Sequence, residues 1–273
     1  MTKIRLDVAM VERGLAPSRE KARARIMAGE VRVNGVPATK AGQEVQEEAE
    51  ITVIGDAIPF VSRGGLKLDK AVRVFPISLN GRVCVDIGAS TGGFTDCMLQ
   101  NGASHVYAVD VGYGQLDWKL RTDDRVTVME RTNARFMEKS WYPNPISFAS
   151  IDVSFISLKL ILPPLYDCLE EGGEVVALIK PQFEAGRSEI GKNGVVRDAT
   201  VHKRVCEELM RFSESIGFRV LGLSYSPITG PKGNIEFLLY IQKGSPKIIS
   251  TEVDFAALAS EIVESSHTMC IKG

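Results

Sequence analysis

Apolar, β-branched segments alternate with helical segments through most of this chain, and that alternation constrains the fold more than any other feature. Because two strands joined by a helix usually run parallel, the pattern predicts an α/β fold with a mainly parallel sheet and helices on both faces. The last strand follows its predecessor without a helix, which predicts an antiparallel hairpin at the sheet edge. Strands are expected at 83–87, 105–110, 126–129, 148–153, 175–179, 220–223 and 236–241, with helices near 92–101, 156–169 and 199–216.

A small α+β module is expected before this sheet, since a chain of 273 residues has room for about two domains. Ser18 is a suitable N-cap for its second helix, and Gly29 ends that helix. Asn34–Gly35 predicts a tight type I′ hairpin. The periodicity breaks at 55–62, which predicts a linker and two domains, 1–60 and 61–273. The expected elements of the module are helices over 6–15 and 19–28, a strand at 31–33, and strands at Val45 and 51–54 that complete one small sheet.

Basic residues are concentrated in this module, although the chain as a whole carries a net charge of only -1. Residues 1–40 contain nine basic and four acidic side chains, which gives a local net charge of +5. On the predicted second helix, Arg19 and Arg23 lie four residues apart, as do Lys21 and Arg25, so two basic rows are expected along its outer surface. A basic segment on a neutral chain indicates where an anionic partner binds.

The cysteines and the apolar segments indicate a cytoplasmic protein. The five cysteines are scattered and never spaced Cys-x-x-Cys, which predicts neither a disulfide framework nor a zinc site. The first residues carry charges every few positions and therefore do not resemble a signal peptide. No uninterrupted apolar run approaches the roughly 18 residues that a membrane helix needs. We therefore expect a reducing cytoplasm, no metal and no membrane.

A glycine-rich turn follows the strand at 83–87 and leads into a helix near Gly92. Such a turn presents backbone N–H groups and the positive end of a helix to a carboxylate or phosphate. Asp110 ends the next strand, where a carboxylate can accept hydrogen bonds from both hydroxyls of a ribose. Ser90 stands where the dinucleotide fingerprint has its second glycine, so a single nucleoside with a carboxylate, such as S-adenosylmethionine, fits better than a dinucleotide. An ordinary turn without a ligand is the alternative.

Asp152 and Lys180 end two further apolar strands. In open α/β sheets the carboxyl ends of the strands form the active crevice, so these two side chains are expected to converge beside the glycine-rich turn. Alternatively, each charge marks only the point where its strand meets water. The coincidence of both residues with the turn favours a site.

Several motifs together resemble one family. The module is similar to S4 domains at 18–23 and 26–35, and the remainder matches at 62–67, 86–94, 152–157, 180–184 and 230–236. The chain resembles the haemolysin-A-like (TlyA) ribosomal RNA 2′-O-ribose methyltransferases, in which an S4 domain precedes an FtsJ-like methyltransferase domain. The resemblance implies a class I (Rossmann-like) methyltransferase fold, S-adenosylmethionine as the cofactor, and ribosomal RNA or a ribosomal subunit as the partner, with a cytidine ribose as the expected target.

The resemblance also implies roles for individual residues. FtsJ-like enzymes carry a Lys-Asp-Lys-Glu tetrad, and the matching residues here are Lys67, Asp152, Lys180 and Glu236. A ribose hydroxyl is a poor nucleophile, so a base must take its proton, and Lys180 is the expected base with Lys67 as the neighbouring cation. The expected cofactor-binding residues are Asp86, Gly88, Ser90, Thr91, Gly92, Gly93, Phe94, Asp110, Asn133 and Asp152; the expected RNA-binding residues are Arg5, Arg19, Lys21, Arg23, Arg25 and Arg63.

Two other functions stay open at this point: a membrane-active haemolysin, and a non-catalytic RNA-binding protein that keeps a nucleoside pocket. A polar loop with Arg187, Lys192 and Arg197 is either solvated or a lid that contacts RNA. The three histidines, His105, His202 and His267, occur singly and are expected at the surface or at strand edges.

Overall fold

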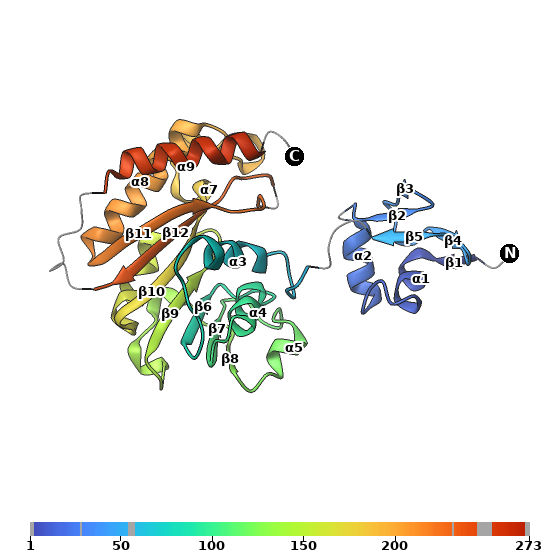
Figure 1. Cartoon of the computed structure of the whole chain (residues 1–273), viewed down its shortest axis with the longest axis horizontal. Coiled ribbons are helices and arrows are strands. Elements are labelled where there is room, and N and C mark those ends of the chain that lie inside the picture. The colour runs from blue at the N-terminus through green and yellow to red at the C-terminus, as the bar shows by residue number, and fades with distance from the viewer. Residues whose placement is uncertain (1–2, 28, 54–57, 231, 245–252, 271–273) are drawn as a thin grey trace. The chain divides into compact units, whose positions relative to one another are not determined.

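The chain divides into two compact units, Met1–Ile58 and Pro59–Gly273. The computed structural model describes residues 3–27, 29–53, 58–230, 232–244 and 253–270, and Figure 1 shows the helices and strands of both units. The linker predicted at 55–62 falls partly on 54–57, which lie outside the described residues.

The N-terminal unit packs two helices against short antiparallel strands. Its core contains Leu6, Met10, Ile26 and Val31, all with no solvent exposure. The turn at Asn34–Gly35 has positive φ at both residues (49° and 77°), as a type I′ hairpin requires. The elements are β1 (Lys3–Arg5), α1 (Leu6–Glu12), α2 (Arg19–Met27), β2 (Val31–Val33), β3 (Val36–Pro37), β4 (Glu44–Gln46) and β5 (Ile51–Val53).

One expectation for this unit is wrong. Val45 does not join the sheet of Ile51: β4 pairs with β1, whereas β5 pairs with β2 in a separate sheet of order β3-β2-β5. The reason is β1, which consists of Lys3, Ile4 and Arg5 and is too short and too polar to be recognised as a strand.

The described residues of the C-terminal unit form a seven-stranded sheet of order β11-β12-β10-β9-β6-β7-β8. Strands β8, β7, β6, β9 and β10 run parallel, and β12 pairs antiparallel with both β10 and β11. The prediction of a mainly parallel sheet with a final antiparallel hairpin is therefore confirmed. The bounds are β6 (Val83–Ile87), β7 (His105–Val109), β8 (Val126–Met129), β9 (Ile146–Ile151), β10 (Leu169–Ile179), β11 (Phe218–Tyr225) and β12 (Phe237–Lys243).

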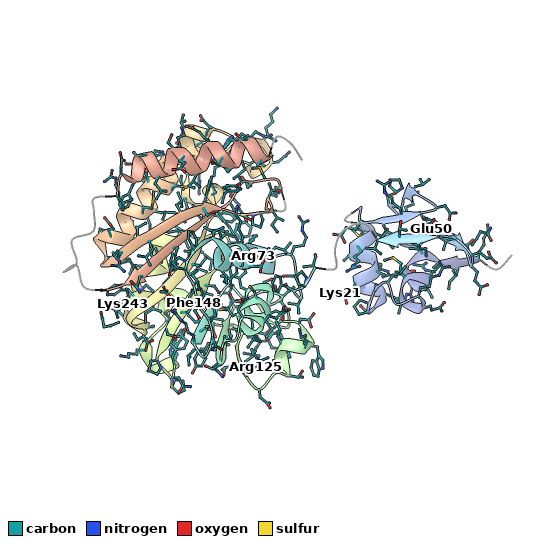
Figure 2. The ribbon with its side chains drawn as sticks, in the orientation of Figure 1. Lys21, Glu50, Arg73, Arg125, Phe148 and Lys243 are labelled. Atoms are coloured by element: carbon teal, nitrogen blue, oxygen red, sulfur yellow. The ribbon has the colours of Figure 1, made fainter. Side chains whose placement is uncertain are left out.

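Helices cover both faces of this sheet. One face packs against α6, α8 and α9 in a continuous apolar core, and α3 packs on α4. Figure 2 labels Phe148, a fully buried side chain of the central strand β9. Among the residues described, no helix is long and apolar enough to cross a membrane. The helices are α3 (Gly65–Val74), α4 (Gly93–Gln100), α5 (Trp118–Arg121), α6 (Leu162–Cys168), α7 (Pro181–Glu184), α8 (Ala199–Ser215) and α9 (Phe255–Cys270).

The expectation that all three histidines lie near the surface is wrong for His202. Its side chain has no solvent exposure, with Nδ1 2.9 Å from His267 Nε2 and Nε2 3.1 Å from the Val196 carbonyl. Burial, together with His267, lowers the pKa of His202 to about 4, so its imidazole is neutral at pH 7. His202 lies in α8 and is buried because α9 packs on that helix. The sequence patterns did not reveal α9.

Four parallel strands bring their carboxyl ends to one edge of the sheet. Gly88 directly follows β6, Asp110 follows β7, Asp152 follows β9 and Lys180 follows β10. Ligands of open α/β sheets bind at this edge, so the order of the strands places the turn and the charged residues together.

Candidate active site

Two lysines and two carboxylates meet at this edge. Asp152 lies between the lysines: its Oδ1 is 2.5 Å from Lys180 Nζ and its Oδ2 is 3.4 Å from Lys67 Nζ. Lys67 Nζ also lies 2.7 Å from Glu236 Oε2. The four residues that the family resemblance implies therefore form one series of ion pairs, Lys180–Asp152–Lys67–Glu236.

Lys67 reaches this cluster from α3. Its side chain is 9% exposed and that of Glu236 is 1% exposed, so both charges are held away from solvent. Burial alone would lower the pKa of the Lys67 ammonium, but Asp152 and Glu236 outweigh burial and raise that pKa above its ordinary value. Lys67 is therefore a cation at neutral pH, because its paired carboxylates stabilise the charged form.

Lys180 has a second partner that sequence analysis did not assign. Its Nζ donates a hydrogen bond to Ser154 Oγ over 3.0 Å. The available signal was the position of Ser154, two residues after Asp152 at the end of the same strand. Asp152 and Ser154 together fix the position of the Lys180 ammonium group.

The glycine-rich turn approaches Asp152 so closely that no side chain fits between them. Gly88 has φ of +85°, and a Cβ on it would lie 2.5 Å from the Asp152 carbonyl oxygen. Only glycine combines this left-handed conformation with such a close approach. The glycine-rich turn and the ion-pair cluster are therefore in direct contact through the backbone of Gly88 and Asp152.

Asp110 is positioned by the same turn. Its Oδ2 accepts a hydrogen bond from the Ser90 N–H (2.8 Å), and its Oδ1 accepts one from the Gly112 N–H (2.6 Å). The carboxylate lines a cavity of about 380 Å³, together with Gly88, Ser90, Asn133 and Asp152. Asn133 Oδ1 accepts a hydrogen bond from the Arg135 N–H (3.1 Å), which fixes this side chain in the lining.

A second cavity, of about 270 Å³, adjoins the first. It is lined by Lys67, Lys180 and Glu236 and, from the turn, by Thr91, Gly93 and Phe94. Gly88, Ser90, Asp152 and Ser154 line both cavities. The ion-pair cluster thus opens toward the space beside Asp110.

Two expected cofactor-binding residues have a different position. Asp86 has no exposure and, among the described residues, is not part of the lining of either cavity. It accepts hydrogen bonds from Thr95 N–H (2.9 Å), Thr95 Oγ1 (2.7 Å) and Ser150 Oγ (3.1 Å), and so ties α4 to the sheet. Gly92 is likewise buried, with φ of +92°. Asp86 and Gly92 therefore support the turn from the protein interior.

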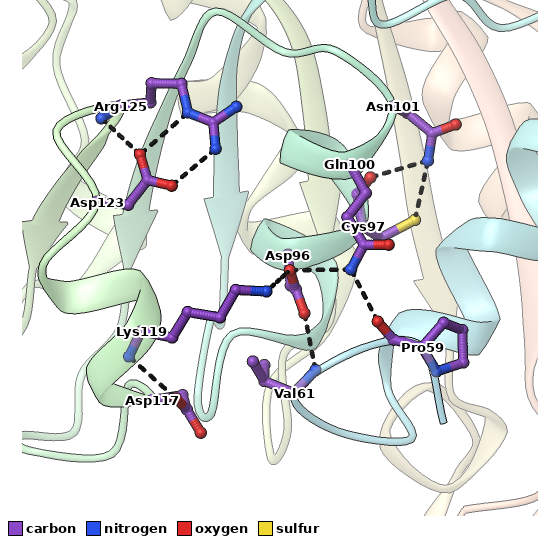
Figure 3. Close-up of polar contacts among 10 residues, drawn as sticks. All are labelled: Pro59, Val61, Asp96, Cys97, Gln100, Asn101, Asp117, Lys119, Asp123 and Arg125. Carbon is purple, nitrogen blue, oxygen red and sulfur yellow. Dashed lines mark hydrogen bonds and ion pairs between the residues drawn. The ribbon is translucent and has the colours of Figure 1, made fainter. Parts of the chain in front are cut away.

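Asp96 fastens the start of the unit to α4, as Figure 3 shows. Its Oδ2 accepts a hydrogen bond from the Val61 N–H (2.8 Å), and its Oδ1 lies 3.3 Å from Lys119 Nζ. Gln100 of the same helix donates to the Pro59 carbonyl (2.8 Å). These contacts join three parts of the unit: the segment that precedes α3, helix α4 and helix α5. They therefore hold α4, which begins at the glycine-rich turn, in place.

A third cavity, of about 390 Å³, shares Ser154, Lys180 and Glu236 with the second. Phe155 and Phe183 line it with ring centroids 5.0 Å apart, and Phe155 is 90% exposed. Ile190 and Gly194 belong to the lining as well, so the polar loop predicted as solvated or as a lid borders this cavity. Its Arg187, Lys192 and Arg197 are exposed.

The expected RNA-binding arginines of the N-terminal unit do not form two freely solvated rows, because contacts within the unit hold their side chains. Arg5, Arg19 and Arg23 all contact the buried carboxylate of Asp7. Arg25 donates to the Leu15 carbonyl (3.3 Å). Lys21, in the same unit, and Arg63, in the other, are exposed.

The burial of Asp86 predicts a pH dependence of stability. Burial raises the pKa of its carboxyl to about 7, against roughly 3.9 when unfolded. Because the folded pKa is the higher, this group's contribution is fully present below about pH 4 and is lost as the pH rises through 7, up to about 4 kcal/mol. The Asp86→Asn protein, which cannot ionise there, should lose this slope in unfolding free energies measured between pH 4 and 8. An unchanged slope would assign the pH dependence to other groups.

Comparison with known proteins gives one consistent result. Residues 60–243 match the model for the FtsJ-like methyltransferase family, and residues 4–51 match that for the S4 domain. The chain is 55% identical over 240 residues to "Putative rRNA methyltransferase YqxC" of Bacillus subtilis, covering 88% of this chain and 85% of that protein. It is 42% identical over 270 residues to "16S/23S rRNA (cytidine-2'-O)-methyltransferase TlyA" of Mycobacterium tuberculosis, covering 98% of each.

A solved structure is similar over the same extent. The "Putative hemolysin from Streptococcus thermophilus" superposes with a TM-score of 0.79 at 49% sequence identity, and the match covers 100% of this chain and 98% of that chain.

Proposed function

We propose that this chain, which belongs to the FtsJ-like methyltransferase family and carries an S4 domain, methylates the 2′-hydroxyl of a ribose in ribosomal RNA. Membership makes it an S-adenosylmethionine-dependent methyltransferase; the ribose and the ribosomal RNA are the proposal. The observation that carries it is the chain of ion pairs Lys180–Asp152–Lys67–Glu236 beside the cavity at Asp110. Such a cluster provides a proton acceptor and charge stabilisation for a hydroxyl nucleophile.

The cavity at Asp110 suits the cofactor. Its volume of about 380 Å³ falls within the range of small-molecule sites. Asp110 provides a carboxylate that can accept hydrogen bonds from the ribose hydroxyls of the cofactor. The turn at Gly88 and Ser90 lies near the start of α4 and provides a backbone surface for the methionine end of the cofactor. S-adenosylmethionine, when bound, supplies an electrophilic methyl group.

The ion-pair cluster prepares the hydroxyl. Lys180 Nζ takes the proton of the 2′-hydroxyl in its neutral form, after the proton that forms its ion pair with Asp152 has passed to solvent, because only the neutral amine is a base. Asp152 holds Lys180 and Lys67 on its two oxygens and so sets the spacing of the two amino groups. Lys67 stays protonated and stabilises negative charge as it develops on the ribose oxygen, and Glu236 balances the charge of Lys67.

The third cavity fits the target nucleoside. Phe155 and Phe183 present aromatic surface beside Lys180, and bases that have left a helical stack are commonly held on aromatic side chains. The name of the Mycobacterium tuberculosis relative supports a cytidine in ribosomal RNA as the target. The basic S4 domain supports RNA binding outside the crevice.

Transfer of labelled methyl groups tests this function directly. The protein, S-adenosylmethionine carrying a labelled methyl group, and ribosomal subunits from cells that lack the protein are incubated, and 2′-O-methylated nucleotides are mapped. Label on the 2′-oxygen of ribose in ribosomal RNA is expected. RNA binding without any label would indicate a non-catalytic RNA-binding protein, and leakage of dye-loaded liposomes without label would indicate a haemolysin.

Asp110 provides a test of the cofactor site. The Asp110→Ala protein should bind S-adenosylmethionine about 1–3 kcal/mol more weakly, because ribose hydroxyls lose a charged acceptor. Titration calorimetry measures the affinity. Asp123→Ala, which removes a carboxylate paired with Arg125 in a turn, is the matched control and should bind as the parent does. Unchanged affinity in Asp110→Ala would remove this residue from the site.

A further inference from the structure

The N-terminal unit contains a fully buried carboxylate that three arginines surround. Asp7 lies in α1 and has no side-chain exposure. Arg5 of β1 contacts it through Nε (3.0 Å, to Oδ1) and Nη2 (3.1 Å, to Oδ2). From α2, Arg19 Nη2 lies 3.2 Å and Arg23 Nε 3.0 Å from the same Oδ2. The carboxylate of Asp7 thus contacts cations from two elements, β1 and α2.

The arginines are not consumed by these contacts. The side chains of Arg5, Arg19 and Arg23 are 46%, 52% and 52% exposed. Each guanidinium carries five N–H donors, and the four hydrogen bonds to Asp7 use only a minority of them. With three cations and one anion, the cluster keeps a net charge of +2. It therefore presents several charge-assisted donors to solvent from fixed positions.

Fixed guanidiniums suit a phosphate backbone. An exposed arginine loses side-chain freedom when it binds, and this loss weakens binding. Contact with Asp7 imposes part of that order before binding, and it also reduces the repulsion among three neighbouring cations. The carboxylate is suited to this role, because the hydrogen bond from Arg5, with Arg23 and Arg19, holds its pKa well below the usual range and keeps it ionised.

We propose that Asp7 is a positioning residue for RNA binding, which orients Arg5, Arg19 and Arg23 as one site for the phosphates of RNA. This inference rests on the proposed function, since it takes RNA as the partner of the S4 domain. It also makes a prediction opposite to simple electrostatics. Removing a negative charge from a polyanion-binding surface ordinarily strengthens binding, whereas loss of a positioning residue weakens it.

The test uses the full-length protein and a fluorescently labelled stem-loop of ribosomal RNA, with affinity measured by anisotropy over a range of salt concentrations. Asp7→Asn should bind about tenfold more weakly than the parent, for the ordering cost of the arginines. The slope of log affinity against log salt should become shallower by about 0.7–0.9 for each phosphate that the arginines no longer neutralise. A fall in the fraction of folded protein would not change that slope.

Glu12→Gln is the matched control, because it makes the same charge change at an exposed residue of the same helix. It should bind as tightly as the parent or slightly more tightly. If Asp7→Asn behaves like Glu12→Gln, the positioning role is overturned while the proposed function stands. If the parent itself does not bind the stem-loop, the proposed RNA binding fails.

A second variant covers the case in which Asp7→Asn does not fold. Arg5→Lys keeps the charge but cannot reproduce the two-point contact with Asp7. Weaker RNA binding with a shallower salt slope is expected, relative to Arg32→Lys, which makes the same change at an exposed residue of β2. Equal binding by the two lysine variants would overturn the inference.

Discussion

Methyl transfer by the Lys180→Arg protein is expected to fall by roughly 10²–10⁴-fold, the contribution that general-base catalysis usually makes. Arginine keeps the positive charge and can still contact Asp152 and Ser154, so the protein should fold and bind S-adenosylmethionine as the parent does. It cannot accept the proton, because a guanidinium stays charged at any accessible pH. Single-turnover rates at saturating RNA, measured across pH, isolate the chemical step.

Lys203→Arg is the matched control for this change. Lys203 also binds a serine and a carboxylate, Ser260 and Glu264, but it lies in α8 and does not line the described cavities. Its arginine variant should retain parental activity. Near-parental activity in Lys180→Arg would instead make Lys180 a cation that positions RNA and would exclude it as the base.

The Asp152→Asn protein should lose about 100-fold or more in single-turnover rate. An asparagine has nearly the same shape but cannot pair with Lys180 and Lys67 at once, so the two amino groups separate. A misplacement of about 1 Å in a reacting geometry costs on the order of 100-fold in rate. Because the change leaves two buried lysines with Glu236 as their remaining carboxylate partner, the unfolding temperature should also fall, so the rates are compared at a temperature at which both proteins are folded.

Asp167→Asn, at an exposed position of α6, controls for loss of an aspartate in general. Cofactor affinity is measured on both proteins by calorimetry. A rate within a few-fold of the parent, with normal cofactor binding, would mean that the spacing of the lysines is set without Asp152.

The part of the site carried by strand ends could be predicted from the sequence. Gly88, Asp110, Asp152 and Lys180 each follow an apolar, β-branched run, and parallel strands align such ends at one edge. Each of these positions can be recognised from the apolar run of residues that directly precedes it. The resemblance to a family added Lys67 and Glu236, which no local pattern marks.

The contacts among these residues could not be predicted in the same way. Lys67 lies in α3, which begins after Gly64 without a side-chain cap and so lacks the usual signal of a helix start. Its contact with Asp152 joins residues 85 positions apart, and such distances between side chains follow from packing and not from spacing.

The arginines of α2 illustrate the same limit. The four-residue spacing of Arg19 and Arg23 correctly places both on one face of a helix. It does not reveal that a buried carboxylate, contributed by another helix, lies beneath that face. In the sequence, Asp7 looks like any polar residue near the start of a helix. Only the structure shows that its carboxylate is buried among arginines.

The close approach of Gly88 to the Asp152 carbonyl limits how this protein can be redesigned to transfer groups larger than methyl. Enlarging the space where the first two cavities meet requires smaller side chains there. Gly88 has none to remove, and Asp152 is committed to the two lysines. Ser90 and Ser154, the other residues that line both cavities, are the positions left for trimming, and Ser154 also contacts Lys180. Extra room for a bulkier alkyl group is therefore most accessible at Ser90.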